Sequence, residues 1–543
     1  MLQPNIENGL RRSVCIIYVL LLAIVAFRLA AMAFLPLMDT TEARYAEIGR
    51  AMAESNDWIT PWFDKDVPFW GKPPLAFWIT AISFKLFGVN EFAARIPHFL
   101  VSVLLVGLTA WWAGLRDRKL VLPIIVILLS SALYFVSAGA VMTDIELALG
   151  ITLAMTGYWS ALNDTDKPNR NLKASSAVLF FGGLITGILA KGPISLILTA
   201  FPIIAWTAYY RAWPKAWSSL PWITGTLITL AMSLPWFAMA EIKTPGFLEY
   251  FIVGEHWNRY LIPAWSGDRY GHPHHYPIGS IWAFAFVDTL PWSIVLPITA
   301  WQWAKKKALQ INKNAISVSV FPFGEDSKWT FYLLLWMLTP LLFFTAARNI
   351  MWTYFLSSLP AFAVLASLWL RRNAPAEHDM HRVLISGLVA LLAVTLIVVT
   401  IRFSNEEKIN EKSAKAMLAQ YFQDVNQREH NGQNNIRNAP LIFVQTRPFS
   451  GQFYSYGKAI KITDLEAAWQ RIGLEAAYVA SPDSSLFKAA MPDLNPSVDE
   501  ISQSNTSTRA KKNTQNRVTI LGRFGNFDLL YIQPVSSDPS NPD

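Results

Sequence analysis

The sequence has little cysteine and little charge. Its 543 residues include one cysteine, Cys15, so no disulfide can form within the chain. Charged residues make up 15% of the chain and hydrophobic residues 53%, with 23 tryptophans and 33 phenylalanines. A soluble globular protein carries a larger charged share than this. The shortage of charge excludes an ordinary soluble fold and predicts a polytopic α-helical membrane protein.

The formal net charge of +8 could indicate a nucleic-acid-binding protein. The lysines and arginines are dispersed in short loops, however, and they do not form a patch with interleaved aromatic residues. Short basic loops are typical of the cytoplasmic side of a membrane protein. We therefore expect the basic residues to set the orientation in a membrane, and we expect no nucleic-acid partner.

Apolar runs of spanning or near-spanning length follow one another through the first 401 residues. They lie at about 13–37, 95–115, 120–137, 143–161, 176–190, 193–210, 219–240, 279–302, 330–346, 351–370 and 383–401. A further run at 72–87 is a second surface helix or a short re-entrant one. The pattern predicts about 11 to 13 spans. Arg28 interrupts the first apolar run just before a cleavage-like Ala31-Met32-Ala33, which favours an uncleaved first helix over a signal peptide.

The loops alternate in charge along the chain. Those assigned to the cytoplasm contain Arg116, Arg118, Lys119, Lys167, Arg170, Lys173, Arg211, Lys215, Lys305, Lys306, Lys307, Arg371, Arg372 and Arg382. The loops 36–94 and 241–278 are long and mixed in charge, and they fall on the opposite face together with the tail. The positive-inside rule therefore predicts that both loops and the tail lie outside the cytoplasm.

The last 142 residues, 402–543, change to a polar composition. Ala414, Met417, Leu418 and Tyr421 recur at helical spacing, and a second helix is expected at 463–472. Strands are expected at 440–445, 476–480, 517–523 and 527–532, the last two joined by a hairpin at Gly525-Asn526. Residues 501–516 have the composition of a disordered segment. The sequence thus divides into a transmembrane catalytic domain, 1–401, with surface helices in its two long loops, and a small soluble α/β domain, 402–543.

The loop 36–94 has the highest density of charge, and its acids are the first candidates for catalysis. Residues 40–54 have the spacing of a helix lying on the membrane surface. Asp39 and Glu42 precede or open that helix, where a carboxylate can activate a nucleophile or stabilise a developing charge. The same spacing fits a capping box, in which both carboxylates only accept bonds from backbone N–H groups.

Basic residues near these acids suit a phosphate group at headgroup depth. Arg44 and Lys72 lie in the first loop, and Glu255-His256-Trp257-Asn258-Arg259 adds a further cation and an imidazole in the second. Snorkelling to lipid headgroups is the alternative for Lys72. His272, His274 and His275 match no zinc spacing, so we expect no metal.

Several ordered motifs resemble the bacterial aminoarabinose transferase and protein O-mannosyltransferase group of GT-C glycosyltransferases. The motifs are Thr41 to Ile48, Asp57 to Pro61, Lys72-Pro73-Pro74, Thr143-Asp144, Ala190-Lys191-Gly192-Pro193, His256 to Arg259 and Leu290-Pro291-Trp292. The resemblance covers roughly residues 10–370.

This resemblance implies a GT-C fold in the bacterial inner membrane with an extracytoplasmic active site. The reaction it implies is transfer of a sugar from a polyprenyl phosphate, such as undecaprenyl phosphate, to an acceptor hydroxyl on lipid A, another glycan or a protein. Inversion at the anomeric carbon is expected, with no cofactor beyond the lipid-linked co-substrate. By matching positions, Lys72 and Arg259 hold the lipid phosphate, and Arg44, Asp144, His256 and Tyr354 line the cavity.

The sequence departs from the family pattern at two positions. Thr41 stands where the family commonly has Asp, and Gly71 stands where many members have Glu before Lys-Pro. The order of candidates for the catalytic acid is therefore Glu42, Asp39 and Asp144, and the aminoarabinose donor is not assumed.

A lipid or sugar transporter and a receptor-like scaffold are the alternative functions. A transporter would keep charged residues near the bilayer midplane, whereas the ionisable residues within the apolar runs lie near their outer ends. These residues are Arg28, Asp144, Glu146, Lys191, Asp288 and Arg348.

Overall fold

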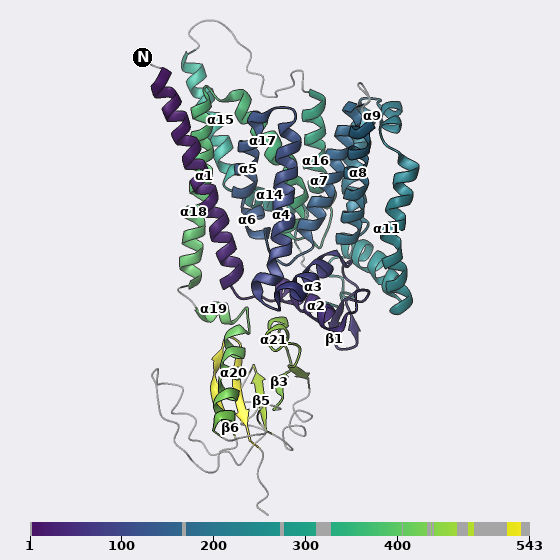
Figure 1. Cartoon of the computed structure of the whole chain (residues 1–543), viewed down its shortest axis with the longest axis vertical. Coiled ribbons are helices and arrows are strands. Elements are labelled where there is room, and N and C mark those ends of the chain that lie inside the picture. The colour runs from purple at the N-terminus through teal and green to yellow at the C-terminus, as the bar shows by residue number, and fades with distance from the viewer. Residues whose placement is uncertain are drawn as a thin grey trace, which may run out of the picture. The chain divides into compact units, whose positions relative to one another are not determined.

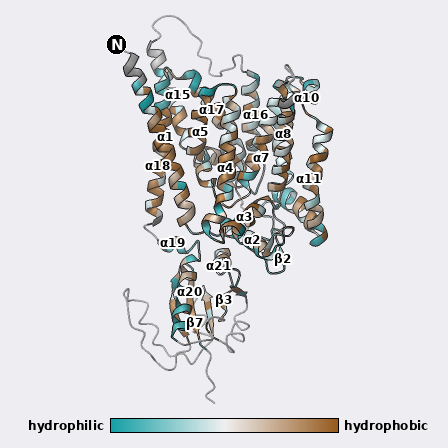
Figure 2. Cartoon of the chain, in the orientation of Figure 1, coloured by the Kyte–Doolittle hydropathy of each residue, from teal (hydrophilic) through white to brown (hydrophobic). Residues whose placement is uncertain are grey.

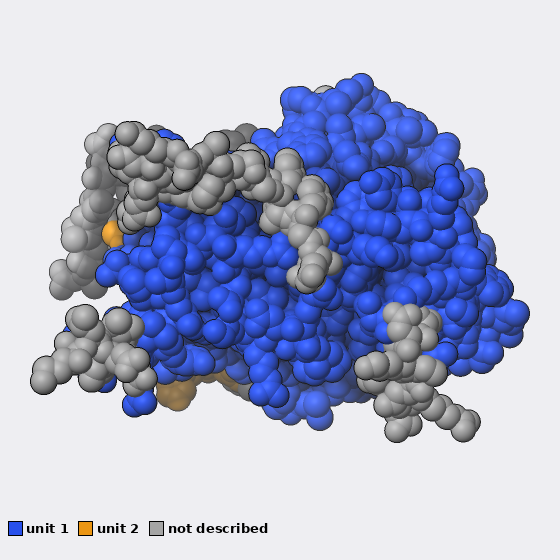
Figure 3. All heavy atoms as spheres, turned by 90° about the horizontal axis from the view of Figure 1, so that it is seen from above, with its two compact units in different colours: residues 1–35, 48–397 blue, residues 36–47, 398–543 orange. Residues whose placement is uncertain are grey.

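The structure is a computed structural model of the whole chain. It describes residues 3–164, 170–271, 276–310, 327–403, 406–431, 436, 439–463, 476–482 and 518–533. The chain divides into two compact units, residues 1–35 with 48–397 and residues 36–47 with 398–543 (Figure 3). The boundary at residue 47 falls within one helix, α2 (Thr41–Ser55).

The first unit is helical (Figure 1). Its N-terminal half contains α1 (Gln3–Phe34), α3 (Leu75–Phe87), α4 (Glu91–Gly114), η1 (Arg118–Leu120), α5 (Val121–Ser130), α6 (Ala132–Ser137), α7 (Asp144–Asp164), α8 (Arg170–Lys191) and α9 (Ile194–Tyr209), with the short strands β1 (Trp62–Asp64) and β2 (Val67–Pro68). Its C-terminal half contains α10 (Trp213–Ser219), α11 (Trp222–Lys243), α12 (Phe247–Glu249), η2 (Tyr250–Asn258), α13 (Arg259–Leu261), α14 (Ser280–Asp288), α15 (Trp292–Gln310), α16 (Ser327–Thr345), η3 (Trp352–Ser358), α17 (Leu359–Asn373) and α18 (Glu377–Phe403).

Among the described residues, eight helices are long and apolar enough to cross a membrane, or nine if α14 and α15, bent by 77°, form one broken span. Their outer surfaces are apolar (Figure 2). Leu22 on α1 is 69% exposed and Ile223 on α11 is 72% exposed. Such contiguous apolar surface is stable in lipid and not in water. The chain is a multi-pass membrane protein, as predicted.

The predicted count of about 11 to 13 spans is not confirmed. The run 120–137 is divided at Ser131 into α5 and α6, where the hydroxyl groups of Ser130 and Ser131 bond back to the carbonyl groups of Val126 and Ile127. The helix from the run 193–210, α9, has only 16 residues. About 20 residues are needed to cross the hydrocarbon core.

Glycines bring α7 and α8 into close contact. A Cβ atom on Gly150 would lie 2.7 Å from the backbone nitrogen of Gly187, and one on Gly183 would lie 2.5 Å from that of Ala154. Small residues at a helix interface allow this approach in membranes. The contact places the end of α8, at Lys191, beside the first turn of α7, at Asp144.

The surface helix α3 is fixed to α4. The side chain of Ser83 donates to the carbonyl oxygen of Ala93, and the hydroxyl group of Thr80 bonds to Nε2 of the buried His98. The other ring nitrogen of His98 lies 2.6 Å from Oε1 of Glu146 on α7. This buried chain of polar contacts holds the segment that follows Lys72 in place.

The second unit contains a five-stranded mixed sheet of order β4-β3-β5-β7-β6. The strands are β3 (Leu441–Val444), β4 (Ile460–Ile462), β5 (Ala477–Ser481), β6 (Val518–Phe524) and β7 (Phe527–Ile532), and the helices are α19 (Glu406–Asn410), α20 (Lys415–His430) and α21 (Phe449–Tyr454). β3 is parallel to β4 and β5, and β7 is antiparallel to β5 and β6.

The predicted elements of this unit are largely confirmed. Met417 and Leu418 on α20 are buried, and the predicted hairpin joins β6 and β7. Three elements of six residues or fewer, β4, α19 and α21, were not predicted from the sequence. The predicted helix 463–472 and the segment 501–516 lie outside the described residues.

Candidate functional site

A cavity that contains several charged side chains lies in the first unit, between η2, η3 and the ends of α7 and α8. Its volume is about 120 Å³. It is lined by Gly71, Lys72, Asp144, Leu147, Lys191, Ile194, Ile197, Leu198, Glu255, His256, Arg259, Tyr260, Phe343, Phe344, Asn349, Thr353, Tyr354 and Ser357. One wall carries most of the charged side chains, and α9 contributes an apolar wall.

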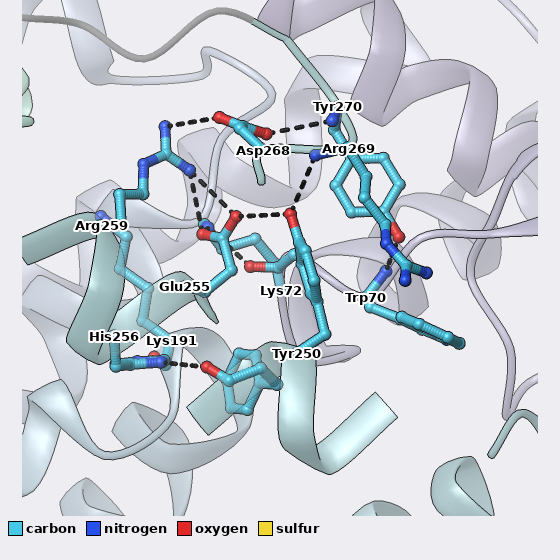
Figure 4. Close-up of polar contacts among 12 residues, drawn as sticks. Trp70, Lys72, Lys191, Tyr250, Glu255, His256, Arg259, Asp268, Arg269 and Tyr270 are labelled. Carbon is cyan, nitrogen blue, oxygen red and sulfur yellow. Dashed lines mark hydrogen bonds and ion pairs between the residues drawn. The ribbon is translucent and has the colours of Figure 1, made fainter. Parts of the chain in front are cut away.

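Two cations share one carboxylate in this cavity (Figure 4). Oε2 of Glu255 lies 3.0 Å from Nζ of Lys72, and both oxygens of Glu255 lie 3.0 Å from Nη1 of Arg259. Nζ of Lys72 also donates to the carbonyl oxygen of Gly71 at 2.6 Å. Such charge-assisted contacts fix the direction of both basic groups.

Glu255 on η2 and Arg259, the first residue of α13, lie on one side because they are four residues apart in a continuous helical segment. The hydroxyl group of Tyr250, one turn earlier, donates to Oε1 of Glu255 at 3.4 Å and accepts a bond from the backbone N–H of Arg269. Asp268 lies 3.7 Å from Nη2 of Arg259. Residues of the 241–278 loop therefore hold the side chains of Glu255 and Arg259 in place.

Aromatic contacts join this loop to the segment that carries Lys72. The backbone N–H of Trp70 donates to the hydroxyl oxygen of Tyr270, which itself donates to the carbonyl oxygen of Pro68. The guanidinium group of Arg269 lies 4.6 Å from the ring centre of Trp70 and 5.3 Å from that of Tyr250. These contacts hold Lys72 opposite Arg259.

The absence of a side chain at Gly71 leaves room for the ring of Phe69. A Cβ atom there would lie 2.9 Å from Cζ of Phe69, whose ring packs against Phe77 and Tyr270. A glutamate, which many family members carry at this position, would have to displace that ring. In this chain the carboxylate next to Lys72 comes instead from Glu255.

The charges of Lys72 and Arg259 determine the protonation of Glu255. Burial raises the pKa of a carboxyl group, but the two cations outweigh burial and lower the pKa of Glu255 to about 2. Burial lowers the pKa of His256. His256 is therefore neutral near pH 7; its Nδ1 lies 2.7 Å from the carbonyl oxygen of Phe251 and its Nε2 lies 3.3 Å from that of Lys191.

A second ion pair lies deeper in the cavity. Nζ of Lys191, at the end of α8, is 2.7 Å from Oδ1 of Asp144, at the start of α7, and 4.8 Å from the ring centre of Tyr354 on η3. Both charged side chains are about 10% exposed. The pair joins the three elements that form this end of the cavity.

Some polar atoms of the lining have no partner within the described part of the chain. They are Nε of Arg259, Oδ1 of Asn349, Oγ1 of Thr353 and Oγ of Ser357. A buried polar atom without a partner costs about 1–3 kcal/mol. Four such atoms around one cavity mark it as the candidate site for a ligand with polar groups.

Five of the eight site residues predicted from the sequence line this cavity. They are Lys72, Asp144, His256, Arg259 and Tyr354. The other three, Asp39, Glu42 and Arg44, belong to the second unit.

These three residues have partners within their own unit. Asp39 accepts bonds from the backbone N–H and the hydroxyl group of Ser450, at the start of α21. Burial raises the pKa of Asp39 although these hydrogen bonds oppose it. Glu42 accepts from the backbone N–H of Met38 at 3.4 Å, and the guanidinium group of Arg44 lies 5.7 Å from the ring centre of Phe449. The catalytic roles of Asp39 and Glu42 stay predictions.

The sequence analysis did not select Glu255, Lys191 or Asn349 as site residues. The spacing of Glu255 and Arg259 was the available signal for the first, and the Ala190-Lys191-Gly192-Pro193 motif for the second. Asn349 donates to the carbonyl oxygens of Arg259 and Ile262, a contact over about 90 residues that no sequence pattern shows.

No group of three or more His, Cys, Asp or Glu side chains suited to a metal ion occurs in the described ranges. His272, His274 and His275 lie outside them. The absence of a metal requirement stays a prediction.

The helical bundle and its cavity define a polytopic membrane protein whose candidate site carries Lys72, Lys191 and Arg259 in ion pairs with carboxylates. Residues 14–251 match the family model described as dolichyl-phosphate-mannose-protein mannosyltransferase. The resemblance to GT-C transferases suggested by the sequence motifs is thus confirmed.

Individual relatives agree with this resemblance. The chain is 30% identical over 358 residues to an undecaprenyl phosphate-alpha-4-amino-4-deoxy-L-arabinose arabinosyl transferase of Enterobacter sp. (strain 638), covering 65% of this chain and 58% of the relative. It is 29% identical over 374 residues to the enzyme of that name from Erwinia tasmaniensis, covering 66% of this chain and 61% of the relative. The match thus spans about three fifths of the length of these relatives.

The fold is that of a solved membrane protein. The crystal structure of ArnT from Cupriavidus metallidurans bound to undecaprenyl phosphate superposes with a TM-score of 0.65 at 16% identity, covering 95% of this chain and 97% of that chain. The same protein in the apo state gives a TM-score of 0.63 at 17% identity. The GT-C fold predicted from the sequence is confirmed.

Proposed function

We propose that this chain is a membrane glycosyltransferase that moves a sugar from a polyprenyl phosphate to an acceptor hydroxyl group. The observation that supports this most strongly is the cavity in which Lys72, Arg259 and Lys191 gather beside unpartnered polar atoms. The relatives are named as transferases that use an undecaprenyl phosphate sugar, and the superposed ArnT was crystallised with undecaprenyl phosphate.

In this proposal the lipid phosphate binds Lys72 and Arg259. Both basic groups line the cavity, and each is about one fifth exposed, so a ligand entering the cavity can reach them. A planar guanidinium group and an ammonium group suit the oxygens of a phosphate. In the transferase reaction, negative charge develops on the phosphate as the bond to the sugar breaks, and fixed cations stabilise that charge.

The sugar occupies the polar end of the cavity. Thr353, Ser357 and Asn349 line this end, and their buried side-chain oxygens, which have no partner in the described part of the chain, are the proposed contacts to sugar hydroxyl groups. Asp144 is held in an ion pair with Lys191, where its carboxylate can orient a hydroxyl group. The first candidate for the catalytic acid is Glu42, the second is Asp39 and the third is Asp144.

The acceptor is lipid A, another glycan or a protein, and the active site faces outward from the bacterial inner membrane. The proposal includes no metal and no cofactor besides the lipid-linked sugar. The eight described helices of spanning length support the membrane location. The short basic loops support the orientation.

The test is to give purified protein a polyprenyl phosphate carrying a radiolabelled sugar. We expect free polyprenyl phosphate to be released. The labelled sugar should be found on an acceptor or, after transfer to water, as free sugar. Intact donor after prolonged incubation, or donor carried across a vesicle membrane without cleavage, would contradict the proposal and favour a transporter. Labelling of a cysteine at Ser55 and at Ser404 by an impermeant reagent from the outer face tests the orientation.

A further inference from the structure

Glu255 has an unusual position for a carboxylate in a phosphate site. Its side chain is 4% exposed, whereas the side chains of Lys72 and Arg259 that contact it are 19% and 20% exposed. A cavity whose only task was to bind an anion would be expected to keep its cations free of internal carboxylates, because a fixed negative charge weakens the binding of another. The carboxylate therefore has a separate effect on ligand selection.

The proposed reaction changes the charge of the phosphate. The donor is a phosphodiester with one negative charge. When the bond between the anomeric carbon and the phosphate oxygen breaks, the electron pair remains on that oxygen. The acceptor oxygen bonds to the anomeric carbon and gives its proton to a base. The product is a phosphate monoester, which carries up to two negative charges because its second pKa is about 6.

The charges of the site can be compared with those of the two lipids. Lys72 and Arg259 together carry two positive charges, and Glu255 removes one of them. Resting on the proposed function, we infer that Glu255 is a specificity-determining residue that matches the site to the singly charged phosphodiester donor and weakens its hold on the doubly charged monoester product. The carboxylate thereby limits inhibition by the released lipid.

The other ionisable groups near Glu255 do not cancel this effect. Asp268, 3.7 Å from Arg259, adds a second negative charge, and Arg269, whose guanidinium group lies 5.3 Å from the ring centre of Tyr250, adds a third positive charge, so the cluster keeps one net positive charge. Tyr250 contributes a neutral hydroxyl group, because burial raises its pKa. His256 is neutral, and Lys191 is paired with Asp144.

The test compares two probe lipids, undecaprenyl phosphate and a non-reactive undecaprenyl methyl phosphate, at pH 8. Their dissociation constants are measured with the purified full-length protein and with Glu255→Gln. The substitution keeps the shape and removes the charge. We expect Glu255→Gln to tighten the monoester at least about 10-fold more than the diester, because the monoester carries one more charge close to the site.

Two control variants separate charge from structure. Glu249→Gln removes one exposed negative charge six residues earlier and should leave the monoester-to-diester ratio unchanged. Glu255→Asp keeps the charge and should keep the wild-type ratio. If Glu255→Gln weakens both lipids, or changes both by the same factor, Glu255 has only a structural role and the inference is wrong.

A measurement on the wild-type protein decides the question if Glu255→Gln does not fold. Between pH 5 and pH 8 the monoester gains its second charge. We expect its affinity to rise by less than about fivefold, because the site offers no matching second charge; a larger rise would overturn the inference. Failure of the proposed function is distinct, since the wild-type protein would then bind neither lipid and leave the donor uncleaved.

Discussion

The carboxylates of the cavity and those of the segment 36–47 have different kinds of partner. Asp144 and Glu255 contact the side-chain cations Lys191, Lys72 and Arg259. Asp39 accepts bonds from the backbone N–H and the hydroxyl group of Ser450, and the contacts of Glu42 include one from the backbone N–H of Met38. The first arrangement holds charges where a ligand can reach them, and the second is what helix ends require. Both regions contain acids beside basic residues in the sequence, and only the partners distinguish them.

The largest effect, on turnover, is expected for Glu42→Gln, because a catalytic Glu42 would give the segment 36–47 a role in the same reaction as the cavity. Glu42→Gln removes the charge and leaves an amide that still accepts a hydrogen bond. As a cap it should cost at most about 1 kcal/mol of unfolding free energy. As the predicted catalytic group its loss should slow turnover by about 10²- to 10⁴-fold.

Turnover and thermal unfolding of Glu42→Gln are measured together. Near-normal turnover would assign Glu42 to capping only, and the catalytic acid would then be sought among the cavity carboxylates. Asp144→Asn is the companion variant, because Asp144 lines the cavity. We expect it to lose activity to an intermediate extent.

The next effect concerns the cations of the cavity. Removing Lys72 or Arg259 by substitution with alanine should cost about 1.5–3 kcal/mol of donor binding, or roughly 10- to 150-fold in affinity. Equilibrium binding of the lipid donor measures this. Arg44→Ala, which removes a cation from the segment 36–47, is the matched control. It should change donor affinity less than Lys72→Ala or Arg259→Ala does. Unchanged affinity in Lys72→Ala would make Lys72 a snorkelling residue.

A smaller effect is expected at Asp39. Its carboxylate accepts two bonds from Ser450, and Asp39→Asn retains only one carbonyl-type acceptor. We expect a loss of about 1 kcal/mol in the unfolding free energy of the second unit, with turnover impaired less than in Glu42→Gln. An inactive Asp39→Asn that unfolds like the wild-type protein would instead identify Asp39 as the catalytic acid.

The stability that Asp39 contributes should depend on pH in a defined direction. Burial raises its pKa in the folded state, so the folded protein binds this proton more tightly than the unfolded chain. The contribution is therefore present below the unfolded pKa, about 4, and is lost as the pH rises through the folded pKa. Unfolding of wild type and Asp39→Asn between pH 4 and 7 measures it, and the difference should grow toward acid if this assignment holds.

The smallest change is expected for donor binding as a function of pH. Glu255, with a pKa of about 2, stays ionised, and the lowered pKa of His256 keeps it neutral. Because the phosphodiester keeps its single charge, its affinity should vary by less than about threefold between pH 6 and 8. A steep change would show that a group of the cavity titrates in that range.

Hydrophobic periodicity was sufficient to predict most helices of both units. The runs of strong apolar character correspond to α4, α7, α11 and α16 within about four residues at each end, whereas α1, α8 and α18 begin about six to ten residues before the predicted runs. It failed at 120–137, because hydropathy does not show that Ser130 and Ser131 bond back to the backbone at a helix break. The hairpin was predictable because Gly525-Asn526 is a local turn signal.

The site was only partly predictable. Lys72 and Arg259 were identified because their motifs resemble those of a known family. The pairing of Asp39 with Ser450 joins residues 411 positions apart, and that of Lys72 with Glu255 joins residues 183 positions apart. Contacts across such long sequence separations are set by the folded chain. The sequence therefore identified the charged residues but could not assign their partners.

The structure of this protein bound to undecaprenyl phosphate tests the central claim most directly. We predict phosphate oxygens within hydrogen-bonding distance of Nζ of Lys72 and of the guanidinium group of Arg259, with Glu255 still contacting both. A phosphate bound elsewhere, with the contacts among Lys72, Glu255 and Arg259 unchanged, would contradict the account.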